Sequence, residues 1–487
     1  MPWLIVGLYF ICLLVIFCYA LLQFSLTLNY LKAKRKRKGD STCELKQYPF
    51  VTIQLPLYNE KYVVARLVDA VAELNYPKDR FEIQILDDSS DETTAIVESK
   101  LAELRTQGIA VDLVRRPDRV GFKAGALAYG MQSAKGEFIA IFDADFIPDP
   151  DFLLKTLPHF EDEQVGVVQT RWEHLNRNTS LLTKLQAFGL DAHFSIEQVG
   201  RNVKDHFINF NGTAGIWRRA TIEDAGGWEH DTLTEDLDLS YRSQLKGWKF
   251  IYREDILSPA ELPIAISALK SQQFRWIKGG AENFKKMAGR ILTAKDVSLM
   301  DRLHGLGHLF NSTVYLFVFI AALLTVPLIY AASVEPLVST VLRWMAFFFL
   351  STLLLMTFYW VSYRESFKSG WLKFPFFIWR FFQYLTVSLG LSYYNTTGIL
   401  QAYRGKKTAF IRTPKFNTGQ KGDWRKNTYL LKDLGTTTII EGLLSIYFIA
   451  GIGISYLAGF YGMIPFQIML ALGFGLIFLY TLKERKG

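Results

Sequence analysis

Five long apolar stretches constrain the fold of this 487-residue chain more than any other feature. The first covers residues 4–28 and contains no charged side chain, and the others cover residues 309–331, 337–361, 437–459 and 461–482. Each is long enough to cross a hydrocarbon core of about 30 Å as a helix. Because the interval between the first two stretches has a mixed composition, the sequence predicts a membrane protein with an inserted soluble domain.

Basic residues set the expected topology. Residues 32–38 contain six Lys or Arg directly after the first stretch, which predicts an uncleaved anchor with the N-terminus outside and residue 32 onward in the cytoplasm; a removed signal peptide is the alternative. Polar residues interrupt the stretch 373–400, and the next loop, 401–432, is basic. We therefore expect an interfacial or re-entrant helix at 373–400, five crossings and a C-terminus inside. The net charge of +9 fits lysines facing anionic lipid and requires no nucleic-acid partner.

The soluble interval alternates short apolar runs with amphipathic ones. Strand candidates cover residues 50–56, 81–86, 109–114, 138–142 and 165–170, and helical patterns cover residues 60–74, 91–106 and 122–133. This alternation is typical of a parallel, doubly wound α/β sheet, which binds ligands at the carboxyl ends of its strands.

Polar and acidic residues follow three of the predicted strands. The loops are Tyr58-Asn59-Glu60, then Asp87-Asp88, then Asp143-Ala144-Asp145. Any one of them is also typical of a turn that caps a helix. Since all three meet at one edge of the sheet, we interpret them as a binding site. Alternate residues of an extended segment face the same side, so Asp143 and Asp145 are candidate ligands for a Mg²⁺ or Mn²⁺ ion that also contacts phosphate. Lys123, at the start of a predicted helix, is a candidate phosphate contact.

Two later segments have both a structural and a functional interpretation. Thr234 is a good N-cap, so Glu235 and Asp236 complement the dipole of the following helix, or Asp236 is a base that the dipole keeps ionised. The local sequence alone favours the first. Residues 262–292 form a basic amphipathic stretch that is expected to lie along the inner leaflet. Within it, Arg275 and Trp276 belong to the motif Gln272-Gln-Phe-Arg-Trp276. These two side chains face either lipid or substrate, and the local sequence favours anchoring in the membrane interface.

Taken together and in this order, these motifs resemble those of the processive inverting glycosyltransferases of family 2. That group includes cellulose synthase, hyaluronan synthase and the cellulose-synthase-like mannan and glucomannan synthases, which this chain resembles most. The resemblance implies a doubly wound GT-A domain inserted between transmembrane helices. The expected divisions are an anchor at 1–30, the GT-A domain at 45–260, interface helices at 261–300, and a channel region at 301–487 with the interfacial helix 373–400 and a gating-like loop at 401–432.

The resemblance also implies roles for individual residues. Asp236 is the expected catalytic base, and Asp143 and Asp145 are the expected metal ligands, with Asp143 also contacting the nucleotide. The remaining nucleotide-binding residues are Tyr58, Glu60, Asp87, Asp88 and Lys123. Residues assigned to the diphosphate and the acceptor are Glu235, Gln272, Gln273, Arg275, Trp276, Asn211 and Gly212. Phe410, Thr413 and Lys415 match a gating loop, in which Arg412 replaces a valine.

The implied activity is that of a metal-dependent hexosyltransferase. A nucleotide sugar, GDP-mannose or UDP-glucose, would extend a β-linked polysaccharide such as mannan, glucomannan or glucan in an inverting displacement, with export through the bilayer, and the β-1,4 linkage is carried by the resemblance alone. One alternative is a transferase that adds a single sugar to a lipid, as ceramide glucosyltransferases do. Another is a non-catalytic export subunit, but all three of Asp143, Asp145 and Asp236 are present. The donor sugar, self-association and export partners stay open.

Overall fold

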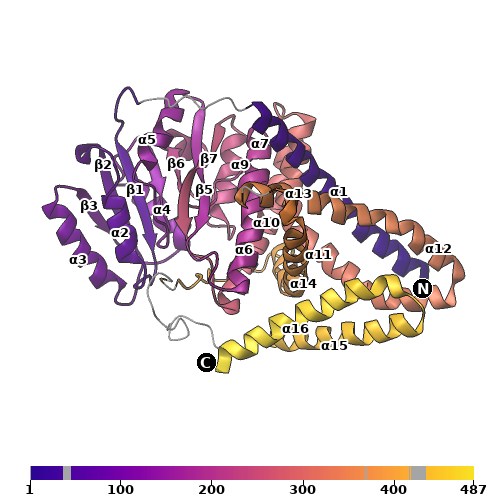
Figure 1. The fold of residues 1–487 in the computed structure, drawn as a ribbon. Helices are drawn as coiled ribbons and strands as arrows, with labels where there is room; N and C mark the ends of the chain where they lie inside the picture. Colours follow the sequence, from indigo (N-terminus) through magenta and orange to yellow (C-terminus); the bar gives the residue numbers. More distant parts are fainter. Residues whose placement is uncertain (1, 37–44, 368–369, 416, 418–434, 487) are drawn as a thin grey trace.

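The computed structural model describes residues 2–36, 45–367, 370–415, 417 and 435–486. Part of the expected gating-like loop, residues 416 and 418–432, lies outside the described residues. Figure 1 shows a twisted sheet with its helices on one side of the molecule and a group of long helices on the other.

A seven-stranded sheet with the order β3-β2-β1-β4-β6-β5-β7 forms the soluble part. The strands are β1 (Val51–Leu57), β2 (Phe81–Asp87), β3 (Ala110–Val114), β4 (Phe138–Ile141), β5 (Val165–His174), β6 (Gly215–Arg218) and β7 (Lys249–Ala260). The first four pair in parallel, as the alternating pattern predicted, with Ile53 opposite both Ile83 and Ala140.

The sheet as a whole is mixed, a feature that the alternating pattern did not predict. The short strand β6 runs antiparallel to both of its neighbours, β4 and β5. Four residues, Gly-Ile-Trp-Arg, carry too little pattern to reveal a strand or its direction. The strand β7 pairs in parallel with β5 and completes the sheet.

Helices cover both faces of the sheet, as expected for a doubly wound domain. One face packs on α2 (Val64–Ala72), α3 (Thr93–Thr106) and α5 (Phe152–Thr156), and the other on α4 (Phe122–Met131) and on the continuous run α6 (Leu181–Ala192), η3 (His193–Glu197) and α7 (Gln198–Asn202). Two further helices, α8 (Arg219–Asp224) and α9 (Glu235–Gln244), follow β6. Short 3₁₀ turns are η1 (Lys78–Arg80), η2 (Leu157–Glu161), η4 (Ala346–Phe349), η5 (Trp371–Lys373) and η7 (Tyr461–Met463).

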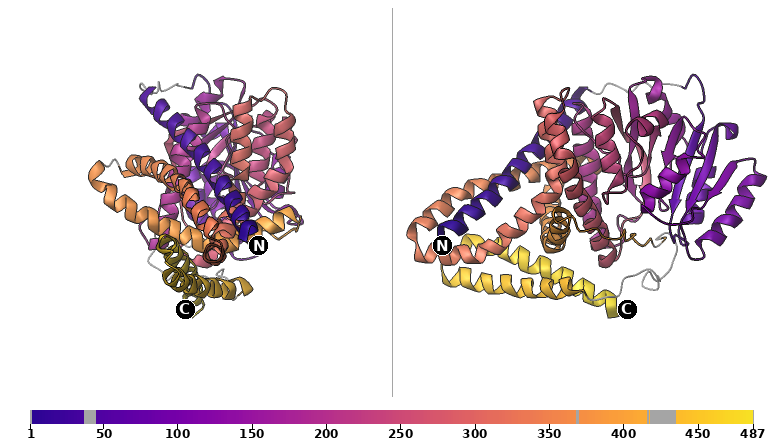
Figure 2. Two further views of the ribbon diagram at one scale, coloured as in Figure 1. Left: turned by 90° about the vertical axis from the view of Figure 1, so that its right-hand side faces the viewer. Right: turned by 180° about the vertical axis from the view of Figure 1, so that it is seen from behind.

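Five helical segments of the described chain are long and apolar enough to cross a membrane, which agrees with the five predicted stretches. They consist of α1 (Pro2–Lys36), α11 (Leu299–Val334), the pair α12 (Pro336–Met345) and α13 (Leu350–Phe367), α15 (Thr436–Leu457) and α16 (Ile464–Lys486). The 30-residue helix α14 (Phe374–Tyr403), predicted as interfacial, is not among these candidates. Seen from behind, α15 and α16 run side by side to the C-terminal end (Figure 2).

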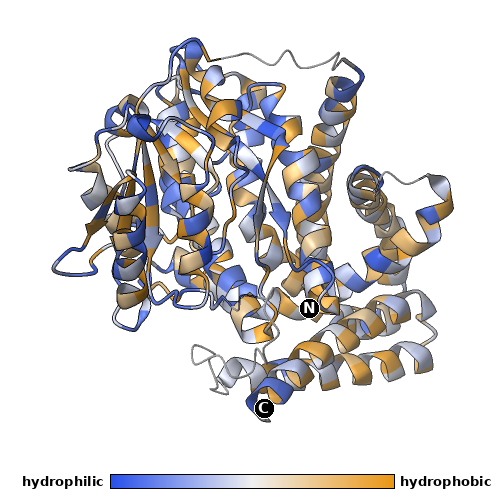
Figure 3. Cartoon of the chain, turned by 60° about the vertical axis from the view of Figure 1, so that its left-hand side comes forward, coloured by the Kyte–Doolittle hydropathy of each residue, from blue (hydrophilic) through white to orange (hydrophobic). Residues whose placement is uncertain are grey.

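Helix α10 (Ile266–Thr293) joins the two parts of the molecule. It packs against α9 on the soluble side and against α11, α14 and α16 on the other. Lys270 donates to Glu441 of α15 across 2.6 Å, and the Glu484 carboxylate of α16 accepts from the first amides of α10. Figure 3 shows apolar residues along the buried strands and along the long helices. The basic amphipathic stretch is therefore a tightly packed connector.

Candidate active site

A cavity of about 170 Å³ lies at the carboxyl edge of the sheet, where the sequence placed a binding site. It is closed on one side by α9 and α10 and on another by residues 410–415. The predicted residues that line it are Tyr58, Glu60, Asp88, Lys123, Asp143, Asp145, Asn211, Gly212, Glu235, Asp236, Gln272, Arg275, Trp276, Phe410, Thr413 and Lys415. Residues from β1 to the segment after α14 thus meet in one place.

Two of the predicted site residues lie elsewhere. Asp87 is buried at the end of β2, where its carboxylate accepts from the Ser89 amide at 2.9 Å and from the Thr94 hydroxyl at 2.6 Å. Those bonds make Asp87 the cap of a turn, which is the structural interpretation that the sequence also allowed. Gln273 is on α10 but does not line the cavity.

Four acids around the cavity each pair with a cation of the same chain. Asp88 receives two bonds from Arg116, at 2.8 and 2.5 Å, and Lys123 lies 2.5 Å from Asp143. Lys415 lies 2.6 Å from Asp145, and Arg412 lies 2.7 Å from Glu60. Burial opposes the charge on Lys123, but Asp143 and Glu235 outweigh it and raise the pKa of the lysine, so the ammonium stays charged.

Asp143 and Asp145 fit a divalent cation by the chemistry of their free oxygens. Asp145 is 1% exposed, and its Oδ2 accepts from Lys415 and, at 3.1 Å, from the amide of Glu261. Its Oδ1 is buried with no hydrogen-bond partner among the described residues. A buried, orphaned carboxylate oxygen beside a second carboxylate is a hard donor set of the kind that Mg²⁺ and Mn²⁺ prefer.

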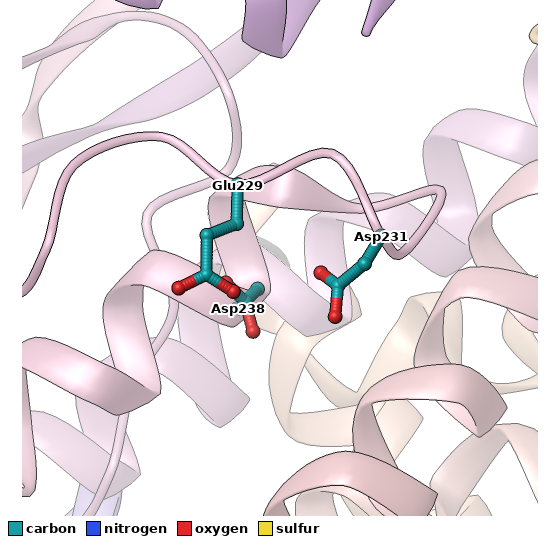
Figure 4. Close-up of side chains that lie close together, drawn as sticks. All are labelled: Glu229, Asp231 and Asp238. Atoms are coloured by element: carbon teal, nitrogen blue, oxygen red, sulfur yellow. The ribbon is translucent and has the colours of Figure 1, made fainter.

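A second group of acids, Glu229, Asp231 and Asp238, is arranged differently. Their carboxylates converge on one point, with Asp238 projecting from α9 and the other two from the preceding loop (Figure 4). The ammonium of Lys286 occupies that point, at 2.6, 2.8 and 2.7 Å from the three carboxylates. Lys286 and the nearby Arg242 offset two of the three negative charges, so the described residues make this cluster an ion-pair network that joins α9 to α10.

Asp236 opens α9 and faces the cavity next to Glu235. Burial and the neighbouring Glu235 together raise the pKa of Asp236 to about 7, and Lys123 offsets them only in part. The amides at the start of α9 also lower this pKa, as expected of a helix N-terminus, but they too are outweighed. A pKa near 7 is the value at which a carboxylate is most effective as a general base at neutral pH.

The segment 406–415 lies over the cavity and is fastened at several points. Lys278 donates to the Lys406 carbonyl at 2.5 Å and to the Thr408 hydroxyl at 2.8 Å. The Phe410 ring stacks on Phe122 at 5.8 Å, and the Arg275 guanidinium lies 4.5 Å from it. Arg275 therefore faces the cavity rather than lipid, and the predicted gating residues border the same space.

The structure adds lining residues to which the sequence assigned no role. Arg119 stacks on the Tyr58 ring at 3.2 Å, and Arg412 pairs with Glu60. Trp172 and His174, at the end of β5, also line the cavity, and burial lowers the pKa of His174 to about 4. The predicted strand 165–170 stops four residues before His174, which ends the observed strand β5, so the sequence pattern did not indicate this residue. Arg119 and Arg412 contact residues that are distant in the sequence, so these pairs could not be predicted from the local sequence.

The soluble part of the chain is similar in sequence to glycosyltransferases. Residues 49–279 match the family described as Glycosyltransferase like family 2. Over 263 residues the chain is 45% identical to the "Probable glucomannan 4-beta-mannosyltransferase 7" of Oryza sativa subsp. japonica, covering 53% of this chain and 45% of that protein. It is 44% identical over 264 residues to the glucomannan 4-beta-mannosyltransferase 1 of Cyamopsis tetragonoloba, covering 53% and 50%. The chain thus spans about half the length of the curated relatives it matches.

The fold is also similar to that of a solved structure, the mannosyltransferase PcManGT from Pyrobaculum calidifontis in complex with GDP-Man and Mn²⁺. The two superpose with a TM-score of 0.54 at 20% identity, covering 81% of this chain and 100% of the other. At that identity the likeness concerns the fold alone. The sequence match shows that residues 49–279 are similar to family 2 glycosyltransferases, and the structural likeness supports a GT-A fold for this part of the chain.

Proposed function

We propose that the protein is a membrane-embedded inverting glycosyltransferase that transfers mannose from GDP-mannose to the end of a β-1,4-linked polysaccharide. The observation that carries the proposal is the meeting of Asp143, Asp145 and the base candidate Asp236 in one cavity. The glucomannan 4-beta-mannosyltransferases, 40–45% identical, and the GDP-Man complex of the structural neighbour support mannose over glucose as the transferred sugar.

On the donor side, the chain presents cations to the diphosphate. Lys123 at the start of α4 and Arg275 on α10 both border the cavity, and both can compensate the charge that develops on the departing diphosphate. When bound at Asp143 and Asp145, a Mg²⁺ or Mn²⁺ ion supplies further charge compensation. The stacked pair of Tyr58 and Arg119 offers a flat surface for the nucleobase.

On the acceptor side, Asp236 takes the proton of the attacking hydroxyl. Attack from the face opposite the diphosphate inverts the anomeric centre, so an α-linked donor gives a β-linkage in one displacement. Trp276 offers an aromatic face on which a sugar ring of the acceptor can stack, and Gln272 offers polar atoms beside it. The long helices next to the cavity support a processive enzyme that releases its product across the bilayer.

The proposed orientation places the glycosyltransferase domain in the cytoplasm, where nucleotide sugars are made, with the N-terminus outside and the C-terminus inside. The basic run at residues 32–38 supports this orientation. Labelling of single cysteines introduced at residues 2 and 224 of intact membrane vesicles tests it. Protection of both positions on the same side would contradict it.

The decisive experiment uses the purified full chain in nanodiscs with Mn²⁺ and with either GDP-mannose or UDP-glucose. We expect polymer from GDP-mannose that an endo-β-1,4-mannanase degrades, and no polymer from the variant Asp236→Asn. A product carrying one sugar on a lipid would replace the processive assignment with the lipid transferase. Polymer from UDP-glucose alone would contradict the proposed donor, and equal turnover by both proteins would contradict the assigned base.

A further inference from the structure

The helix that leads into the acceptor side of the cavity contains an irregular turn. Residues 181–202 form one continuous helix, but His193–Glu197 adopts the wider π-helical hydrogen-bond pattern between the α-helical parts α6 and α7. Such turns are rare, and they occur frequently at functional sites. Neither His193 nor Glu197 lines the cavity, and the proposed reaction assigns no role to either.

Within this turn, His193 connects a buried ion pair to the cavity wall. Its Nδ1 lies 2.8 Å from the Glu197 carboxylate, and its Nε2 lies 3.3 Å from Oδ1 of Asn211. Glu197 also accepts from the buried Arg201. Burial alone would raise the pKa of Glu197, but Arg201 and His193 outweigh it and hold the pKa well below its usual range. The carboxylate is therefore charged and fixes the imidazole ring.

The side chain of Asn211 is held by its oxygen. Asn209 Nδ2 at 2.8 Å and Gln198 Nε2 at 3.3 Å donate to Asn211 Oδ1. His193 Nε2 lies 3.3 Å from the same oxygen and donates to it as an imidazolium, since Nδ1 already donates to the Glu197 carboxylate. Its backbone amide is held separately by Gln169 at 2.9 Å. The orientation of the carboxamide is assigned from these bonds, because turning it over would place its NH₂ group against the two amide donors.

The NH₂ group of Asn211 is left without a partner among the described residues. Asn211 lines the cavity, and the next residue, Gly212, lies against the Asp236 carboxylate, since a Cβ atom there would be 3.0 Å from Asp236 Oδ2. A buried amide donor without a partner costs free energy unless a ligand supplies an acceptor. A sugar hydroxyl or ring oxygen beside the base is an acceptor of that kind.

We propose that the His193–Glu197 π-turn is a positioning device that holds the Asn211 carboxamide so that its NH₂ group donates to an oxygen of the acceptor sugar during transfer. This inference rests on the proposed function, because the acceptor must be a sugar. His193 is a positioning residue that acts through Asn211 and does not touch the substrate.

A double-mutant cycle tests the coupling. The wild type, His193→Ala, Asn211→Ala and the double variant are compared as full chains in nanodiscs, with GDP-mannose, Mn²⁺ and a β-1,4-linked manno-oligosaccharide acceptor. We expect each single variant to raise the KM for the acceptor about tenfold, the effect of one lost hydrogen bond. Because His193 acts through Asn211, the double variant should be no worse than Asn211→Ala alone. Effects that multiply to about a hundredfold would overturn the proposal.

The Asn211 NH₂ group could donate its hydrogen bond to the acceptor sugar or to the mannose of the donor. Hydrolysis of GDP-mannose in the absence of acceptor distinguishes these two cases. We expect hydrolysis by His193→Ala to stay within about twofold of the wild type, since only the acceptor loses a contact. A fall in hydrolysis that matches the fall in transfer would place the bond on the donor sugar and overturn the assignment to the acceptor.

Two further variants guard against a general loss of structure. His193→Gln retains one side-chain donor and is expected to fall between the wild type and His193→Ala. His206→Ala is the matched control, because His206 forms a similar 2.6 Å pair with Asp301 but has no contact with Asn211 in the described structure. An equal rise in KM for His206→Ala would overturn the proposal. An active wild type with unchanged His193→Ala would refute this inference alone, whereas a wild type that transfers no sugar would refute the proposed function as well.

Discussion

The acidic residues on the two sides of the cavity differ in whether they form ion pairs. On the donor side, Glu60, Asp88, Asp143 and Asp145 each pair with a lysine or arginine of the same chain. On the acceptor side, Glu235 and Asp236 form no ion pair with any described residue, and burial raises the pKa of both. The two sides share one cavity and one class of side chain, so environment alone separates their roles.

The difference has a chemical meaning. A carboxylate paired with a cation keeps that cation in place, which suits the recognition of a diphosphate. A buried carboxylate without a cation gains affinity for a proton, which suits a base. Lys123 belongs to both sides, because it contacts Asp143 and also donates to the Gly212 carbonyl at 2.9 Å. It is the element that links donor binding to the acceptor side.

The largest expected effect follows from neutralising the unpaired acid. Asp236→Asn removes the base but keeps its shape, so we expect transfer to fall by about 10²–10⁴-fold while GDP affinity is unchanged. Steady-state transfer and calorimetric titration with GDP measure the two quantities. Asp224→Asn is the control, since Asp224 is a helix-end acid that pairs with Lys246 outside the cavity. Transfer within tenfold of the wild type would place the base elsewhere.

Neutralising a paired acid of the donor side should weaken the Mn²⁺-dependent binding of the nucleotide, which Asp236→Asn should leave unchanged. Asp145→Asn removes the partner of Lys415 and the orphaned oxygen proposed for the metal, so we expect a fall in transfer of about 10²–10³-fold. Unlike Asp236→Asn, it should abolish the increase in GDP affinity that Mn²⁺ produces. Asp149→Asn, which breaks a 2.9 Å pair with Lys155 beyond the site, is the control. If Mn²⁺ still increased the GDP affinity of Asp145→Asn, the proposed role of the paired acids in nucleotide binding would be contradicted.

The sequence predicted the donor side better than the acceptor side, for a physical reason. The acids of the donor side follow strands, and parallel strands bring their carboxyl ends to one edge whatever the details of packing. Asp143 and Asp145 could therefore be placed from the local pattern. The environment of Asp236 at the start of α9 depends on tertiary burial, and for this residue the local sequence favoured the dipole role.

What the sequence missed depends on contacts between distant segments. The direction of β6 cannot be read from four residues, and the pairing of Arg412 with Glu60 joins the start of the sheet to a segment after α14. The hydrogen bond from His193 to Asn211 is of the same kind. The five apolar stretches were predictable because the length of a membrane span is a local property.

The third group of acids, Glu229, Asp231 and Asp238, forms ion pairs outside the cavity, and no substrate is proposed to bind there. Lys286→Met would leave Glu229, Asp231 and the buried Asp238 without their shared cation, so we expect a loss of stability of roughly 2 kcal/mol, less than for a fully buried pair because two of the acids are partly exposed. Thermal unfolding in detergent measures it, with the neighbouring Lys285→Met as control. Stabilisation of the wild type by Mn²⁺ that Asp145→Asn retains would show instead that this cluster binds metal.

The smallest expected effect concerns the pH at which the unpaired acid works. Asp236 must lose its proton before it can accept one, so with a pKa of about 7 the value of kcat/KM should fall as the pH drops through 7. Glu235→Gln removes the neighbouring negative charge, which lowers the pKa of Asp236 and should move this acid limb down by roughly one pH unit. Glu235→Asp retains the charge and is expected to leave the limb in place.

Burial also raises the pKa of Glu60 to about 7 on the donor side. A limb that stays fixed in Glu235→Gln but disappears in Glu60→Gln would therefore assign the pH dependence to nucleotide binding.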